Sequence, residues 1–171
     1  VLVFEAEDHA RARGARILAE VAGFGMTADA GDIVAPSGAG AALAMRAALA
    51  DAGLDLAEVG YINAHGTGTL ANDRAESMAI RDVFGSNAPP VSSTKSMHGH
   101  AIGATGALEA VACVLALNEG LLPPTLGFQA ADPDCPIDVV THRARKARVS
   151  AALSNAFAFG GLNAVLAFRA A

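Results

Sequence analysis

Two histidines could do chemistry together, because each follows a predicted strand and lies beside glycine. His65 ends the apolar segment 59–65 and enters "HGTGT", and His100 follows segment 89–94 and "KSMHG". Glycines and small residues let a ligand approach the backbone, and open α/β sheets place their sites at the carboxyl ends of strands. We therefore expect both imidazoles at one edge of a sheet.

Neutral imidazoles that donate N–H to one carbonyl oxygen would stabilise an enolate or a tetrahedral oxyanion. A helix predicted soon after His100 adds positive partial charge from its N-terminus. One alternative is a metal site built from His98 and His100 with His65 and Asp73. No His-x3-His or Cys-x2-Cys spacing supports it, so we expect no metal. The other alternative for His65 is a hydrogen-bonded core histidine.

Lys95 and Glu109 carry opposite charges within reach of the same loop. Glu109 lies one to two turns inside a predicted helix, so it could turn back toward His100 or Lys95. That arrangement would be a buried network fixing the orientation of the imidazole. The alternative is a surface ion pair, worth about 0–1 kcal/mol.

The elements that position these residues follow from hydrophobic periodicity and from glycine at helix ends. The expected strands are 1–5, 16–26, 59–65, 89–94, 150–159 and 163–170. The expected helices are 8–13, 40–52, 73–84 and 104–118. From residue 16 onward the order β, α, β, α, β, α, β, β predicts an α/β fold, a mixed five-stranded sheet covered by helices.

Two further segments have alternative interpretations. Phe157 and Phe159 in "NAFAFGG" would share a face of the strand before a hairpin turn at Gly160–Leu162. They are either core residues or an aromatic gate moved by the following glycines. Loop 123–138 is the longest irregular stretch, and loops of that length are usually functional or packed on a partner.

Composition limits the function classes. The 171 residues are 53% hydrophobic with a net charge of −5 and no Trp, which argues against a nucleic-acid surface. The basic segment 142–148 is either a solvated loop or a contact for an acidic partner. Two cysteines suit a reduced, cytoplasmic protein better than a disulfide framework.

No apolar run reaches the roughly 18–20 residues of a membrane span, because Asn118 and Glu119 interrupt the longest one. The chain begins at Val1, within a predicted strand and without the pattern of a signal peptide. We therefore expect a fragment of a longer, soluble protein.

Five motifs, "NAHGTGT", "SSTKSMHGH", "GATGALEA", "LPPT" and "SNAFAFGGLNA", give the chain its resemblance to a known family. They occur in the order and spacing of the C-terminal half of the beta-ketoacyl-acyl carrier protein synthases, the type II condensing enzymes of bacterial fatty acid synthesis. The match covers essentially the whole chain. It implies half of a thiolase-like fold, a homodimer and acyl carrier protein as partner, with no cofactor. The implied reaction is a decarboxylative Claisen condensation that adds two carbons from malonyl-acyl carrier protein to an acyl primer.

The resemblance also implies residue roles. His65 and His100 would hold the malonyl thioester carbonyl and stabilise the enolate formed on loss of CO2. Lys95 and Glu109 match the supporting lysine and glutamate. The gating phenylalanine matches Phe159, and the threonines that hold the phosphopantetheine arm match Thr67 and Thr69.

The chain departs from the family pattern in its cysteines. The family nucleophile is a cysteine at a strand–helix elbow of the N-terminal half, which residues 1–171 do not include. Cys113 lies in an apolar helix and Cys135 in the "DPDCPID" loop, so neither has the setting of a reactive thiolate. We expect that this chain alone forms no acyl-enzyme.

Other branches of the family remain open. His98 stands where many relatives have threonine, and "SMHGH" with "DVV" and the basic tail is similar to the nodulation protein E branch. A polyketide synthase, or a non-catalytic partner subunit like the chain-length factors, would share the fold. A thiolase-type enzyme pairs a cysteine with one histidine, so the two histidines disfavour it.

Overall fold

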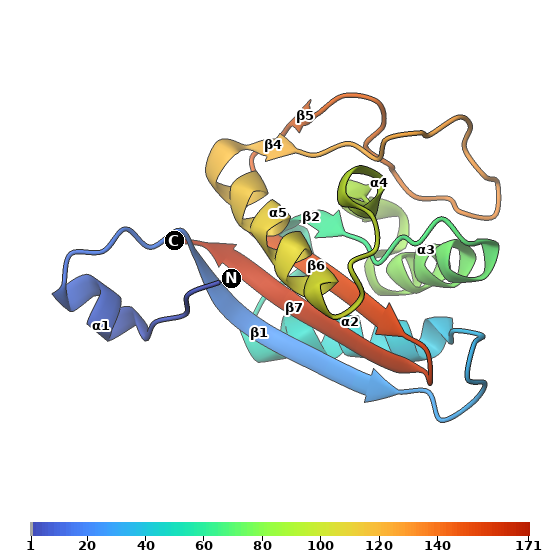
Figure 1. Ribbon diagram of the computed structural model, residues 1–171, viewed down its shortest axis with the longest axis horizontal. Helices are drawn as coiled ribbons and strands as arrows, with labels where there is room; N and C mark the ends of the chain where they lie inside the picture. Colours follow the sequence, from blue (N-terminus) through green and yellow to red (C-terminus); the bar gives the residue numbers. More distant parts are fainter. Residues whose placement is uncertain (1) are drawn as a thin grey trace.

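A computed structural model describes residues 2–171, and its centre is a mixed five-stranded sheet (Figure 1). The strand order is β1-β7-β6-β2-β3, with β7 antiparallel to both β1 and β6, and β2 parallel to both β6 and β3. The strands are β1 Ala19–Ala28, β2 Val59–Asn63, β3 Val91–Ser92, β6 Ala151–Ala158 and β7 Leu162–Ala170. The predicted α/β class and the mixed five-stranded sheet are confirmed.

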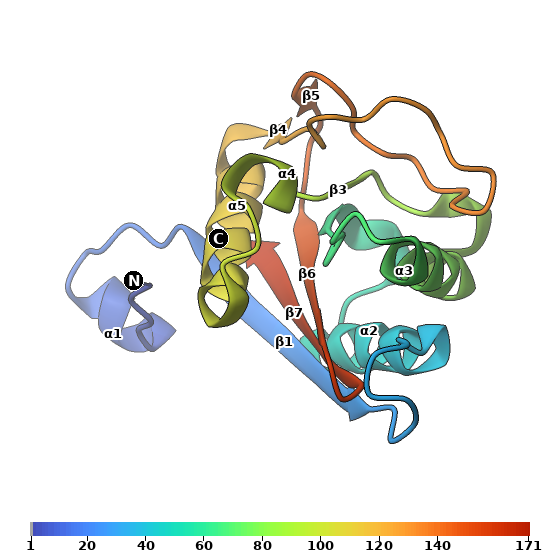
Figure 2. The same cartoon turned by 45° about the vertical axis from the view of Figure 1, so that its right-hand side comes forward.

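Helices cover both faces of this sheet. The main helices are α2 Gly38–Ala52, α3 Leu70–Phe84 and α5 Thr105–Glu119. Figure 2 shows α2 and α3 on one face and α5 on the other. Each face encloses its own apolar cluster, one including Met45 and Ile80 and the other including Tyr61 and Cys113. The central strands β2 and β6 are therefore buried on both sides, as parallel strands require, whereas edge strand β1 leaves Phe24 and Met26 exposed.

The helix ends agree with the local sequence. The Ser37 side chain accepts a hydrogen bond from the Gly40 N–H at the start of α2. Gly53 and Gly120 end α2 and α5 in the left-handed conformation, at φ 59° and 62°. Strand β1 lies close against α2, because a Cβ on Gly25 would collide with the carbonyl oxygen of Ala44.

The prediction of a strand at 1–5 is wrong for residues 2–5, and Val1 lies outside the described residues. Residues 2–6 have no regular structure, and the side chains of Val3 and Phe4 are exposed, so this apolar run has no partner strand in the described part. The strand predicted at 16–26 begins at Ala19. The short helix α1 covers Glu7–Ala12, close to its predicted position.

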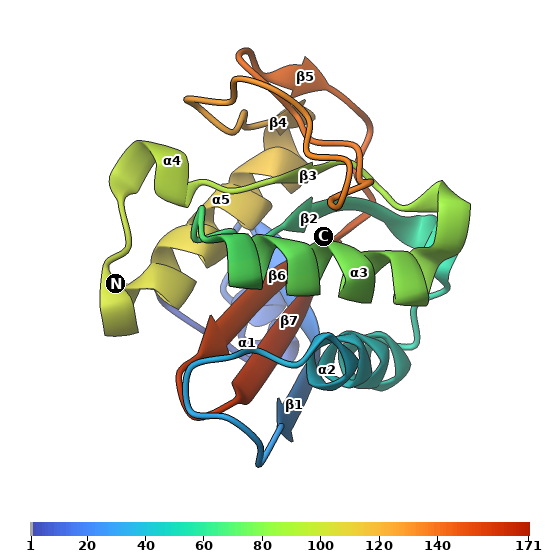
Figure 3. The same cartoon turned by 90° about the vertical axis from the view of Figure 1, so that its right-hand side faces the viewer.

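Several short elements were not predicted from the sequence. These are the helix α4, Lys95–His98; the 3-10 turns Leu56–Glu58, Gly85–Asn87 and Ile102–Ala104; and the strands β4 Leu121–Leu122 and β5 Arg145–Lys146. Strands β4 and β5 form a separate antiparallel pair, so part of the basic segment 142–148 is a strand. Loop 123–138 leads away from β4 and lies over β3 and α3 (Figure 3).

Helix α5 combines an inner and an outer apolar face. By length and composition alone, the stretch Ile102–Glu119 could cross a membrane, which the sequence reading did not expect. Core helices of globular proteins have the same features, and the inner face of α5 packs on the sheet through Cys113 and Ala116. The outer face leaves Val111 and Leu115 exposed. The composition is weak evidence for a span.

Candidate functional site

The two histidines lie beyond the carboxyl ends of adjacent parallel strands. β2 ends at Asn63, two residues before His65, and β3 ends at Ser92, from which α4 and Gly99 lead to His100. Their ring centroids are 5.6 Å apart, in an edge-to-face arrangement with an interplanar angle of 84°. The sequence expectation that both imidazoles meet at one edge of the sheet agrees with this geometry.

His65 is buried and electrically neutral in its setting. Burial, the nearby Lys95 ammonium and His100 together lower the pKa of His65 to about 3. The ring of Phe157 packs 5.7 Å away, and Nδ1 of His65 has no hydrogen-bond partner among the described residues. A neutral imidazole in this position can donate an N–H to a ligand oxygen while staying uncharged at physiological pH.

His100 is exposed, and its Nδ1 atom faces the protein. The backbone N–H of Ile102 donates to Nδ1 over 3.2 Å, and Thr105 Oγ1 lies 3.1 Å from the same atom. His100 also lines a cavity of about 770 Å³. Because Nδ1 faces the protein, Nε2 is the nitrogen left for a ligand.

Lys95 and Glu109 form a buried ion pair behind the histidines. Glu109 is completely buried on the inner face of α5, and the Lys95 side chain is only 5% exposed. Burial raises the pKa of Glu109 to about 7, against the opposing effect of Lys95. The alternative of a surface ion pair is therefore ruled out, and the expected burial of the pair is confirmed. The side-chain contacts of His100 go to Thr105 and Ile102 and not to this pair, so its role in orienting the imidazole stays a prediction.

Glu76 is a site residue that sequence reasoning missed. It is buried in α3, and its carboxylate accepts hydrogen bonds from the backbone N–H groups of His65 and Gly66, each over 2.9 Å. The Asn155 amide on β6 donates to it over 3.0 Å. Burial raises the pKa of Glu76. Glu76 thus fixes the backbone of His65 between α3 and β6.

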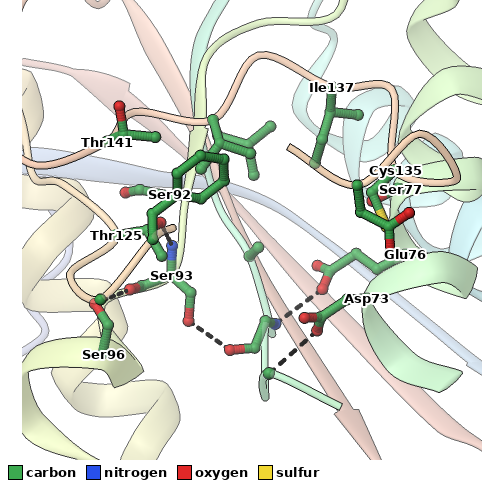
Figure 4. Close-up of a pocket in the computed structure, with 18 of the residues that line it drawn as sticks. Asp73, Glu76, Ser77, Ser92, Ser93, Ser96, Thr125, Cys135, Ile137 and Thr141 are labelled. Carbon is green, nitrogen blue, oxygen red and sulfur yellow. Dashed lines mark hydrogen bonds between the residues drawn. The ribbon is translucent and has the colours of Figure 1, made fainter. Parts of the chain in front are cut away.

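The cavity is lined by residues from the segments that follow β2, β3 and β4 (Figure 4). Ser93 and Thr125 lie on one side of it, and Glu76 and Cys135 on the other. The Arg74 and Asp134 side chains form an exposed ion pair that links α3 to loop 123–138. A cavity of this size can hold an extended small ligand that ends near His100.

The two threonines proposed for the phosphopantetheine arm differ in position. Thr67 lines the cavity, whereas Thr69 lies at the start of α3 and is not part of the lining. Their hydroxyl groups lie 2.9 Å apart and share a hydrogen bond. Thr69 can therefore orient Thr67.

The two phenylalanines do not share a face, contrary to the sequence expectation. Strand β6 ends at Ala158, so Phe159 begins the turn 159–161 and is 78% exposed. Phe157 points inward against His65. Backbone N–H of Gly160 bonds to the carbonyl of Ile33, which ties this turn to loop 29–37.

The residues considered as metal ligands are not grouped around a common point. Across residues 2–171, no three His, Cys, Asp or Glu side chains converge to hold a metal ion. His98 instead contacts the Gly99 carbonyl and the Thr94 hydroxyl.

The two cysteines have different surroundings. Cys113 is fully buried, burial raises the pKa of its thiol, and its sulfur faces the Leu153 carbonyl at 3.7 Å. Such a thiol is a poor nucleophile. Cys135 is partly buried and lines the cavity, a position not anticipated from the sequence.

Comparison with known proteins agrees with this geometry. Residues 18–129, more than half of the chain, match the family model described as the beta-ketoacyl synthase C-terminal domain. Nodulation protein E of Rhizobium sp. (strain N33) is 57% identical over 98% of this chain and 42% of its own length. The 3-oxoacyl-[acyl-carrier-protein] synthase 2 of Vibrio harveyi is 46% identical over 99% of this chain and 42% of its own length.

A solved structure described as the ishigamide ketosynthase/chain length factor superposes with a TM-score of 0.96 at 49% identity. The superposition covers 98% of this chain and 41% of the chain in the solved structure. The predicted likeness to the C-terminal half of a thiolase-like ketosynthase is therefore confirmed. The chain spans about two fifths of the length of these relatives.

Proposed function

This chain belongs to the beta-ketoacyl synthase family, and we propose on that basis that the complete protein is an acyltransferase that performs decarboxylative Claisen condensation. The observation that carries the proposal is the pair His65 and His100, 5.6 Å apart beside a cavity of about 770 Å³. Two imidazole N–H groups that donate to one oxygen would stabilise an enolate, which is the charge that decarboxylation creates.

In the proposed reaction, a malonyl thioester lies in the cavity with its carbonyl oxygen toward the two imidazoles. The bond from the α-carbon to the carboxylate breaks, CO2 leaves, and the electron pair forms an enolate that His65 and His100 stabilise by hydrogen bonds. The enolate carbon then attacks an acyl thioester and displaces the sulfur. The low pKa of His65 keeps it a neutral donor throughout.

The supporting residues have roles in this scheme. Lys95 and Glu109 hold the loop that carries His100, and the Lys95 charge disfavours protonation of His65. Thr67 would contact the phosphopantetheine arm, and Thr69 would help to hold that arm through its hydrogen bond to Thr67. The exposed Phe159 would gate the acyl side.

We assign residues 1–171 to the C-terminal part of the synthase domain. The nucleophilic cysteine would lie in the remainder, whose helices would cover the outer face of α5. The partners would be acyl carrier proteins that carry acyl and malonyl groups, with a homodimer in the cytoplasm. Elongation of fatty acids is our first choice of pathway, and the match of the 3-oxoacyl-[acyl-carrier-protein] synthase 2 of Vibrio harveyi over 99% of this chain is consistent with it. A nodulation-type or polyketide synthase is the second, because nodulation protein E from Rhizobium is more similar in sequence.

The first test is decarboxylation of malonyl-acyl carrier protein by the complete protein, followed as release of CO2. His65→Ala and His100→Ala should each abolish it, whereas His9→Ala, an exposed change on α1, should have no effect. Decarboxylation at a near-normal rate in either site variant would refute the enolate role.

The second test addresses the nucleophile. Residues 1–171 alone, incubated with an acyl donor, should show no stoichiometric thioester by mass spectrometry at Cys113 or Cys135. An adduct at either would overturn our placing of the nucleophile elsewhere. A non-catalytic partner subunit would be supported if the complete protein also formed no acyl-enzyme.

A further inference from the structure

Thr105 touches the catalytic candidate His100 without any role in helix capping. It is the first residue of α5 and is 4% exposed, and its Oγ1 lies 3.1 Å from Nδ1 of His100. The residue preceding the helix, Ala104, has no side chain that could cap it. The Thr105 hydroxyl is therefore directed at the imidazole and not at the free N–H groups of the helix.

The partners of Nδ1 determine where the proton of neutral His100 lies. The Ile102 backbone N–H donates to Nδ1 over 3.2 Å, and an N–H group can only donate. Nδ1 is then an acceptor, and the proton of the neutral ring is on Nε2. A hydroxyl group can rotate to donate to Nδ1 as well, so Thr105 adds a second donor to the same lone pair.

We propose that Thr105 is a positioning residue that holds His100 as its Nε2–H tautomer, with that N–H directed into the cavity. The inference rests on the proposed function, since the donor it prepares is one of the two that would stabilise the enolate. Thr105 acts through His100 and contacts no reacting atom.

Threonine suits this position better than a longer polar residue. Its β-branch restricts the rotation about χ1, and burial at the base of α5 restricts it further. The hydroxyl therefore stays beside the imidazole with little entropic cost on substrate binding. The contact also links the start of α5 to the loop that carries His100.

The test compares Thr105→Val with Thr105→Ser in the complete protein. Valine keeps the branched shape and removes the hydroxyl, whereas serine keeps the hydroxyl. Loss of one hydrogen bond should lower kcat for malonyl decarboxylation about three- to tenfold in the valine variant, with KM unchanged. Thr105→Ser keeps the hydrogen bond to His100, so its kcat should stay within about twofold of that of the unsubstituted protein.

A spectroscopic measurement separates positioning from a packing defect. In protein labelled with nitrogen-15 at histidine, with His100→Ala used to assign the signals, Nδ1 of His100 should appear unprotonated and Nε2 protonated. Thr105→Val should add a population with the proton on Nδ1, and Thr105→Ser should not. Thermal unfolding of both variants checks that they are folded.

The inference is overturned if Thr105→Val keeps both the original kcat and the original tautomer, or if serine behaves like valine. It is supported if the valine variant loses rate and tautomer together. Failure of the proposed function would look different, because the protein itself would then not decarboxylate malonyl-acyl carrier protein while the nitrogen-15 comparison still reported on Thr105.

Discussion

The pKa of His65 is lowered and that of Glu109 is raised, so the two residues should affect the pH dependence of folding stability in opposite directions. Two substitutions can separate these contributions. The pKa of His65 is lowered from 6.5 to about 3, so between these values the unfolded chain binds a proton that the folded chain does not. Stability from His65 is present above pH 6.5 and is lost as the pH falls. At about 1.4 kcal/mol per pH unit, the total loss is about 5 kcal/mol.

Glu109 has the opposite sign. Its pKa is raised from 4.5 to about 7, so the folded chain binds the proton first when the solution is acidified. The free energy of unfolding therefore rises by about 3 kcal/mol as the pH falls from 7 to 4.5. Between pH 6.5 and 4.5 the contributions of His65 and Glu109 have opposite signs and nearly cancel. The buried Glu76, whose pKa is also raised by burial, adds to both substituted and unsubstituted profiles in the same direction as Glu109.

Substitution of either residue should reveal the pH dependence of stability that the other residue contributes. His65→Gln should become more stable by about 3 kcal/mol between pH 7 and 4.5, and Glu109→Gln should lose about 3 kcal/mol over the same range. The measurement is the free energy of unfolding from urea titrations at several pH values. The slope with pH is the quantity to compare, because each substitution also changes absolute stability.

Glu119→Gln, at an exposed carboxylate, serves as the control and should follow the unsubstituted protein at every pH. The reasoning is refuted if His65→Gln and Glu109→Gln both give profiles parallel to that of the unsubstituted protein. It is also refuted if the signs are exchanged.

Two further predictions concern buried contacts. One oxygen of Glu76 accepts from the His65 N–H and the Asn155 amide, and the other accepts from the Gly66 N–H. Glu76→Gln replaces one of these oxygens with an NH2 group and leaves the donors on that side without an acceptor, so it should cost about 2–4 kcal/mol in urea unfolding, against near zero for Glu119→Gln. An unchanged midpoint would show that these donors find other partners. Gly25→Ala should cost about 3 kcal/mol because its Cβ would collide with Ala44, whereas Gly106→Ala, where nothing lies within 4 Å, should be neutral or stabilising, and equal thermal midpoints would contradict the close packing of β1 on α2.

The sequence predicts the order of elements and the meeting of the two histidines well. Strong periodicity and helix-ending glycines mark the three main helices, and parallel strands bring their carboxyl ends to one edge. The strand predicted at 1–5 failed because a β-type run does not by itself supply a neighbour to pair with. The short strands β4 and β5 were missed because two residues carry no periodic pattern.

Glu76 shows what local patterns leave out. In sequence it resembles any acidic residue on the solvent side of an amphipathic helix. Its role depends on Asn155, 79 positions away on β6, and on two backbone N–H groups that turn toward α3. Only the packed fold brings these donors together, so a buried carboxylate of this kind is found in the structure and not in the spacing of residues.

Helix α5 places Thr105, Glu109 and Cys113 four residues apart along its inner face. Thr105 contacts His100, Glu109 contacts Lys95, and Cys113 contacts the Leu153 carbonyl. Each residue added within α5 would rotate the following part of this stripe by about 100° relative to the part before it. An insertion or deletion between Thr105 and Cys113 would therefore prevent the three contacts from forming together. The same change within loop 126–137, whose far side is joined to α3 by an exposed ion pair, would leave them intact. Length variation should consequently be tolerated on one wall of the cavity and not on the other.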